Sequence, residues 1–130
     1  MLHHFAITVS DLPTSMAFYR LVLEGVGYAL SHYDEKRIAV WLGPNPEILI
    51  YQARTDQLDR KHVTYDPGIH HIAFQVDERE VIDKLWKDLK LNGYHILDDP
   101  REYPEYAENY YAVFFEDPDG IKLELMCLSS

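Results

Sequence analysis

A short strand-like segment occurs twice in this chain, and this repeat constrains the fold more than any other feature. Residues 3–11 read HHFAITVSD, and residues 70–77 read HHIAFQVD. Both copies begin with two histidines, share an alanine and a valine at the same offsets, and lead into a segment with helical periodicity. An internal repeat of this length indicates two copies of one structural unit.

The two copies have one apolar face and one small, polar face, because side chains alternate across a strand with period two. The apolar faces consist of Phe5, Ile7 and Val9 in the first copy and Ile72, Phe74 and Val76 in the second. The opposite faces consist of His4, Ala6 and Thr8, and of His71, Ala73 and Gln75. His3 and His70 fall on the apolar side at the start of each strand, where fraying or capping is more usual than function.

Each copy is followed by the same predicted order of elements. Ser10 or Asp11 with Pro13 is typical of a helix start, and glycines end that helix. In the second half, Asp77 and Glu80 predict a capping box. The first half is predicted to hold a helix over 14–24 and strands over 28–33, 37–42 and 47–52. The second half is predicted to hold an amphipathic helix that ends at Asn92 and Gly93, strands over 94–97, 110–115 and 121–127, and a loop over 98–109.

The predicted fold class is α+β, with two βαβββ modules related by a pseudo-twofold axis. Residues 1–130 are expected to form one domain, built from a module at 1–52, a linker at 53–68 and a module at 69–130. The polar faces of the two sheets are expected to curl around a shared cleft, with a helix on each apolar face. The predicted core comprises Phe5, Ile7, Val9, Phe18, Ile72, Phe74, Val76, Leu85, Leu123 and Leu125.

Composition narrows the class of partner. The formal net charge is −10 without a basic cluster, which argues against nucleic acid and anionic membrane surfaces. Apolar runs are far shorter than the roughly 18 residues of a membrane span, and the N-terminus lacks a signal-peptide pattern. The single cysteine, Cys127, cannot form an internal disulfide, so a cytoplasmic location is expected.

The last predicted strand adds a carboxylate to the polar faces that carry the two histidines. Lys122, Glu124 and Met126 alternate with an apolar row, so Glu124 is expected to face the same cleft as His4 and His71. Two imidazoles and one carboxylate suit Zn, Ni, Mn or Fe(II) and leave positions open for substrate or water. Periodicity alone is equally compatible with structural histidines and a solvated glutamate.

Several motifs together resemble the vicinal oxygen chelate superfamily, which includes glyoxalase I, fosfomycin- and bleomycin-resistance proteins, methylmalonyl-CoA epimerase and extradiol dioxygenases. The matching segments cover nearly the whole chain: His4-x-x-Ile7-x-Val9-x-Asp11-Leu12, Ser15-x-x-Phe18-Tyr19, His71-Ile72-Ala73-Phe74-x-Val76, and FEDPDGIKLEL at 115–125. They are specific for the superfamily but do not identify the member. The resemblance implies paired modules and a divalent metal ion held by His4, His71 and Glu124. It also implies a substrate that chelates the ion through two neighbouring oxygens, with the ion acting as a Lewis acid.

One departure from glyoxalase I is informative. That enzyme has a fourth ligand, a glutamate on the last strand of its first half, and alignment with the segment from Pro46 to Tyr51 places Ile50 there. Isoleucine cannot ligate a metal ion. The chain therefore looks more like the three-ligand fosfomycin-resistance and dioxygenase branches than like glyoxalase I.

Other polar residues are predicted to complete the site. Thr8 and Gln75 are candidate wall residues, and Arg101 and Tyr106 are candidate substrate-binding residues in a loop able to close over the cleft. Glu124 and Tyr103 are the candidate catalytic residues. A solvated aromatic loop is the competing interpretation of the same tyrosines.

The favoured hypothesis is a metal-dependent lyase, isomerase, transferase or dioxygenase that acts on a small oxygen-rich molecule. The alternatives are a metal-free binding protein of the bleomycin-resistance type and an interaction module supported only by the tyrosine-rich loop. A homodimer is expected, because small sheets expose edges that proteins generally cover.

Overall fold

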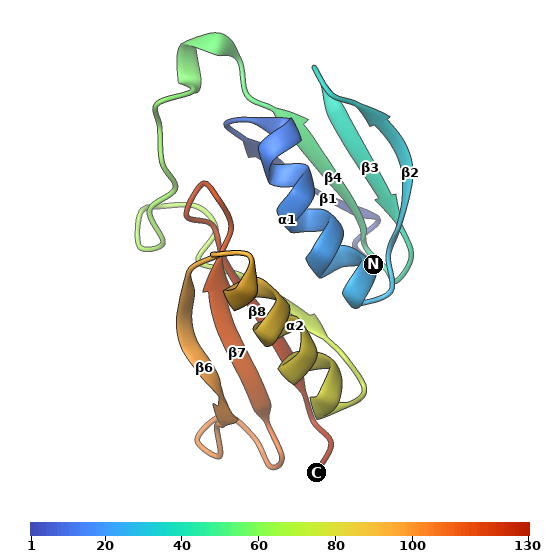
Figure 1. Cartoon of the computed structure of the whole chain (residues 1–130), viewed down its shortest axis with the longest axis vertical. Helices are drawn as coiled ribbons and strands as arrows, with labels where there is room; N and C mark the ends of the chain where they lie inside the picture. Colours follow the sequence, from blue (N-terminus) through green and yellow to red (C-terminus); the bar gives the residue numbers. More distant parts are fainter. The chain divides into compact units, whose positions relative to one another are not determined.

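The computed structural model describes residues 1–130, apart from the side chain of Gln57. The chain divides into two compact units, residues 1–61 and 62–130. Each unit contains the order β-α-β-β-β that the sequence repeat predicts, and each forms its own four-stranded sheet (Figure 1). The α+β class with two mixed sheets is therefore confirmed.

The first unit holds a sheet in the order β1-β4-β3-β2. Its outer strand β1 pairs in parallel with β4, and the other pairs are antiparallel. A short 3-10 helix at Thr55–Gln57 follows the sheet. The elements are β1 (His4–Val9), α1 (Leu12–Gly25), β2 (Ala29–Asp34), β3 (Ile38–Leu42) and β4 (Glu47–Gln52).

The second unit repeats this topology in the order β5-β8-β7-β6. Here β5 pairs in parallel with β8, while β8 with β7 and β7 with β6 are antiparallel. The elements are β5 (Ile72–Gln75), α2 (Arg79–Leu91), β6 (Ile96–Glu102), β7 (Tyr111–Glu116) and β8 (Lys122–Cys127).

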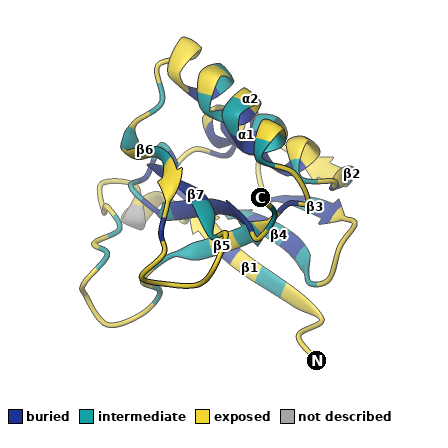
Figure 2. Ribbon diagram, turned by 90° about the horizontal axis from the view of Figure 1, so that it is seen from below, coloured by how far each residue is buried: buried dark blue, intermediate teal, exposed yellow. Residues whose placement is uncertain are grey.

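Each helix contacts one face of its own sheet and leaves its outer side in solvent (Figure 2). In α1, Phe18 and Val22 are fully buried, and in α2 Ile82 and Leu89 are fully buried. This arrangement places the apolar stripe of each helix against apolar strand residues, and it leaves the opposite face of each sheet for other roles.

The predicted strand faces are confirmed, although three predicted core residues are only half-buried. Ile7, Val9, Phe18, Val76, Leu85, Leu123 and Leu125 are buried. Phe5, Ile72 and Phe74 are half-buried, since β1 and β5 lie at sheet edges and have a strand neighbour on one side only.

The two helix starts differ. Asp11 caps α1 and accepts hydrogen bonds from the backbone N–H of Thr14, at 3.1 Å, and from the Thr14 hydroxyl. The capping box predicted at Asp77 and Glu80 is wrong, because α2 begins one residue later, with Glu78 as an N-cap that makes no side-chain capping bond.

The segment over 98–109, predicted as a loop, is a strand in its first part. β6 continues to Glu102, and only the following residues turn back toward β7. Both faces of β8 are buried in its central part: Glu124 is 3% exposed, and Met126 packs with Tyr103, Ala112 and Phe114. The face expected to be open and polar is thus partly covered by aromatic side chains.

Within the part of the chain that the structure describes, neither helix is long and apolar enough to span a bilayer.

Candidate functional site

A histidine at the start of one strand and a glutamate from the adjacent parallel strand meet on the face of the second sheet that lies away from α2. His71 immediately precedes β5, and Glu124 lies in β8, where it pairs in register with Ala73. His71 Nε2 lies 3.2 Å from Glu124 Oε1. The Glu124 side chain is 3% exposed and that of His71 is 32% exposed, so the pair is reachable only from the imidazole side.

A tight turn fixes where Glu124 lies along its strand. Asp117 Oδ1 accepts hydrogen bonds from the backbone N–H groups of Asp119 and Ile121, at 2.9 and 2.8 Å. Gly120 has φ +84°, a conformation that L side chains rarely adopt, as the sequence predicted for this turn. The turn joins β7 to β8 and sets the register that pairs Phe114 with Glu124.

The second carboxylate oxygen of Glu124 also has a partner. Tyr110 donates its phenolic hydrogen to Glu124 Oε2. Burial raises the pKa of Tyr110, and the hydrogen bond to Glu124 and the charge of that carboxylate raise the pKa further. Tyr110 is therefore a neutral hydrogen-bond donor throughout the physiological pH range.

The doubled histidines adopt the same local arrangement in both units. His70 Nδ1 lies 2.7 Å from His71 Nδ1, and His3 Nδ1 lies 2.9 Å from His4 Nδ1. The pKa of His70 is lowered by desolvation and then by the nearby His71 and Lys122. In the second unit this contact leaves Nε2 of His71 as the ring nitrogen directed at Glu124.

A cavity of about 530 Å³ opens beside this pair, entirely within the second unit. Most of the residues that line it carry aromatic rings, and an arginine and a lysine lie between them. Its lining comprises Tyr65, His70, His71, Asp98, Arg101, Tyr103, Tyr106, Tyr110, Phe114, Lys122 and Glu124. The lining combines aromatic rings with four charged side chains, and a concave site with convergent polar groups is typical of small-molecule binding.

A register shift in β6 between Asp98 and Arg101 explains how opposite charges reach one cavity wall. Asp98 pairs with Phe114 and Arg101 pairs with Ala112, so three residues on β6 span two on β7. In a regular strand, Asp98 and Arg101 would point to opposite faces, and the extra residue of the bulge brings both to the cavity.

The predicted site residues Arg101, Tyr103 and Tyr106 all line the cavity, but their setting differs from a mobile lid. Tyr103 is only 4% exposed, and the Arg101 guanidinium lies 3.6 Å from its ring centroid. Tyr106 stacks parallel on Tyr103 with centroids 5.1 Å apart. Burial raises the pKa of the Tyr103 phenol, with the charge of Arg101 opposing it.

Lys122, Tyr110 and Tyr65 are cavity residues that the sequence interpretation did not select. The Lys122 ammonium lies 4.9 Å from the centroid of the Phe114 ring. Tyr110 lies two and four residues before Ala112 and Phe114, so strand periodicity places it on the Glu124 face and was an available signal. Tyr65 lies in the segment predicted as a linker, where no periodicity marks it.

Three predicted residues do not line this cavity. Gln75 is exposed in β5, and Thr8 and His4 are exposed in β1, which belongs to the first unit. Among the residues that the structure describes, no three His, Cys, Asp or Glu side chains gather closely enough to hold a metal ion.

The strand register corrects one position in the first unit. Ala6 pairs with Leu49, just as Ala73 pairs with Glu124. Leu49, not Ile50, is therefore the counterpart of Glu124, and the sequence alignment is one residue out. Leucine also lacks a ligating atom, so the first unit has no carboxylate at this position. Glu47 does share the face of His4, its direct register partner.

The spacing of the His71–Glu124 pair fits common binding to one divalent ion. Two ligand atoms about 2.1 Å from an ion, at an angle of about 90–109°, lie about 3.0–3.4 Å apart. The Nε2–Oε1 distance of 3.2 Å falls in that interval. The same contact is a hydrogen bond when Nε2 carries a proton.

Comparison with known proteins decides the family. The model of the Glyoxalase/Bleomycin resistance protein/Dioxygenase superfamily matches residues 1–125. The chain belongs to this superfamily. The resemblance drawn from the histidine repeat and the FEDPDGIKLEL segment is thereby confirmed.

Relatives within the superfamily match the chain along nearly its whole length. The uncharacterized protein YqjT of Bacillus subtilis is 31% identical over 129 residues, covering 98% of this chain and 99% of YqjT. The metallothiol transferase FosB of Staphylococcus epidermidis is 29% identical over 127 residues, covering 95% of this chain and 78% of FosB. The crystal structure of a candidate glyoxalase from Bacillus halodurans has a TM-score of 0.83 at 30% identity, covering 98% of this chain and 95% of that one.

Proposed function

We propose that this chain is a metal-dependent enzyme acting on a small oxygen-rich molecule that chelates one divalent cation. The proposed ligands are His4, His71 and Glu124, and the cation is Zn, Ni, Mn or Fe(II). The observation that carries the proposal is the approach of His71 Nε2 to Glu124 Oε1, 3.2 Å apart at the wall of a cavity. A bound cation would supply Lewis-acid stabilisation of negative charge on the substrate oxygens.

Among the reactions found in the superfamily, group transfer has the most support. FosB proteins from two genera, which are metallothiol transferases by name, are similar to this chain over 95% of its length. A three-ligand site with a leucine at the counterpart of Glu124 agrees with the three-ligand branches better than with glyoxalase I.

The remaining cavity residues have roles that follow from their chemistry. Arg101 and Lys122 are the proposed contacts for an anionic group of the substrate, on a wall that also carries the carboxylates of Asp98 and Glu124. Tyr106 and Tyr103 offer a surface of stacked rings at the cavity wall. Tyr103 is the candidate catalytic hydroxyl, and Thr8 and Gln75 are proposed as outer contacts for substrate.

Metal binding by the purified, dialysed protein tests the proposal. The wild type should bind about one Zn²⁺ or Co²⁺ per chain, measured by calorimetry and elemental analysis. His71→Ala, Glu124→Gln and His4→Ala should each abolish stoichiometric binding. His95→Ala is the matched control, because His95 and Glu116 form a second His–Glu pair, 3.5 Å apart, outside the cavity lining.

The competing function is metal-free binding of a small molecule, which the aromatic wall of the cavity favours. A wild-type protein that takes up no divalent ion at neutral pH would support this function and contradict the enzyme proposal. Equal loss of metal in His95→Ala and His71→Ala would show that uptake occurs away from the cavity.

A further inference from the structure

The two carboxylate oxygens of Glu124 have different partners. Oε1 faces His71 Nε2, whereas Oε2 accepts the hydrogen bond of Tyr110. The carboxylate is almost completely buried, so its two oxygens depend mainly on these two partners. A carboxylate that is held by a donor on one oxygen is available to a metal ion mainly through the other.

We propose that Tyr110 is a positioning residue that presents Glu124 to the divalent ion through Oε1 alone, beside Nε2 of His71. The inference rests on the proposed function, because it names the ligating atom of that metal site. Hydrogen-bonding partners of metal ligands commonly fix ligand orientation, and losing one typically costs about 10–100-fold in metal affinity.

The protein holds the Tyr110 ring in place from several sides. Its backbone carbonyl accepts a hydrogen bond from the N–H of Tyr103 at 2.7 Å. The ring lies edge-on to Tyr106, with centroids 5.4 Å apart, and edge-on to Tyr103, with centroids 6.4 Å apart. These contacts restrain the phenol from the turn between β6 and β7, so it presents its hydroxyl to Glu124 from one direction.

The simplest competing explanation is that Tyr110 only satisfies a buried carboxylate, as buried polar groups require. That role predicts a loss of stability when the hydroxyl is removed but no change in how an ion is coordinated. The positioning role predicts a change in coordination as well.

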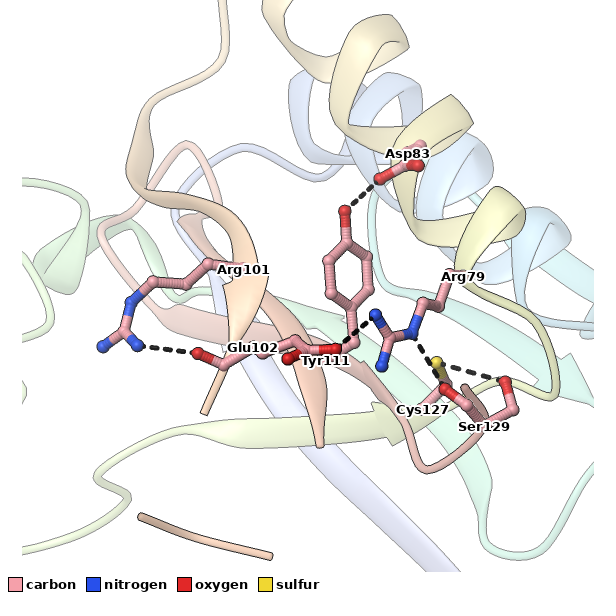
Figure 3. Close-up of polar contacts among 7 residues, drawn as sticks. All are labelled: Arg79, Asp83, Arg101, Glu102, Tyr111, Cys127 and Ser129. Atoms are coloured by element: carbon pink, nitrogen blue, oxygen red, sulfur yellow. Dashed lines mark hydrogen bonds and ion pairs between the residues drawn. The ribbon is translucent and has the colours of Figure 1, made fainter. Parts of the chain in front are cut away.

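The neighbouring residue offers a matched control. Tyr111 follows Tyr110 in the chain and points to the opposite face of the sheet. There it donates a hydrogen bond to Asp83 Oδ1 of α2 at 2.5 Å (Figure 3). The Arg79 guanidinium lies 4.8 Å from the ring centroid of Tyr111. Tyr111 does not line the cavity, so its hydroxyl forms a comparable phenol–carboxylate bond away from the site.

The experiment compares full-length wild type, Tyr110→Phe and Tyr111→Phe, with Co²⁺ as the probe. Tyr110→Phe should weaken Co²⁺ binding about 10–100-fold in calorimetry. It should also lower the intensity of the visible Co²⁺ absorption, because a released carboxylate can bind through both oxygens and raise the coordination number. Tyr111→Phe should keep wild-type affinity and spectrum while losing similar thermal stability.

A second measurement reads the wild type itself and so does not depend on how well Tyr110→Phe folds. The infrared stretching bands of Glu124, identified by their absence in Glu124→Gln, should be widely separated in the loaded protein, as one-oxygen ligation requires. Narrowly separated bands would overturn the inference. Wild-type Co²⁺ affinity and spectrum in Tyr110→Phe would also overturn the inference, but they would leave the proposed function intact. A wild type that binds no Co²⁺ or Zn²⁺ would overturn both.

Discussion

Tyr110 and Tyr111 donate to carboxylates on opposite faces of one sheet. Strand alternation is sufficient to separate them: one hydroxyl reaches Glu124 in the cavity and the other reaches Asp83 on the helix. Two residues of the same type, adjacent in the chain, thereby acquire different roles.

The stability of the protein at alkaline pH should depend on Tyr111. Burial, the hydrogen bond to Asp83 and the charge of Asp83 raise the pKa of Tyr111 to about 12, from 10.0. The folded state therefore holds this proton more tightly, and the contribution is complete below pH 10 and is lost as pH rises toward 12. The difference in unfolding free energy between wild type and Tyr111→Phe should shrink over that interval, as measured by urea unfolding. A difference that stays constant would contradict the assignment.

Period-two alternation was sufficient to predict that His71 and Glu124 share a face, and it contained the signal for Tyr110. Alternation could not predict that Asp98 and Arg101 share a wall, because they lie three residues apart and meet only through a bulge. Tyr103 was selected as a candidate but its burial was not foreseen, since that burial depends on packing against Phe114 and Met126 from other strands.

At the scale of elements, the two helices begin with unequal caps. The side chain of Asp11 satisfies the backbone N–H of Thr14 in the first turn of α1, whereas Glu78 makes no such bond in α2. Asp11→Ala should destabilise the protein by about 1 kcal/mol. Glu78→Ala should change stability by no more than about 0.5 kcal/mol. Urea unfolding measures both, and equal losses would show that the Asp11 cap contributes nothing specific.

Central and edge strands should differ in their tolerance of truncation. Phe115 on β7 is fully buried, whereas Phe74 on the edge strand β5 is half-buried. Phe115→Ala should cost about 3–5 kcal/mol, the usual range for a buried phenylalanine. Phe74→Ala, for which the sequence alone suggested the same range, should cost clearly less. A larger loss for Phe74→Ala than for Phe115→Ala would mean that the edge strand is more deeply packed than its exposure indicates.

At the scale of the whole molecule, the sequence repeat was the strongest predictor. It gave the order of all eight strands and both helices, because each module must bury one apolar face under one helix. The residues at which the strands begin and end were less predictable. The strand that was expected to stop at Leu97 runs to Glu102, through a proline and four charged residues that carry no strand pattern.

We expect the protein to be a homodimer. Each sheet has two edge strands, β1 and β2 in the first and β5 and β6 in the second, and proteins generally cover or pair such edges. Sedimentation at tens of micromolar should give twice the 15.3 kDa mass of one chain. A monomer at that concentration would contradict the expectation.

Because β6 is bulged, the number of residues in this strand affects the cavity as much as the identity of those residues. Removing one residue between Asp98 and Arg101 would restore regular alternation and turn one of these charges away from the cavity toward α2. Insertions and deletions at this point would therefore change which ions the cavity attracts while every remaining amino acid is preserved. Relatives that differ here by a single residue in length should differ in ligand preference even where their histidines and glutamate coincide.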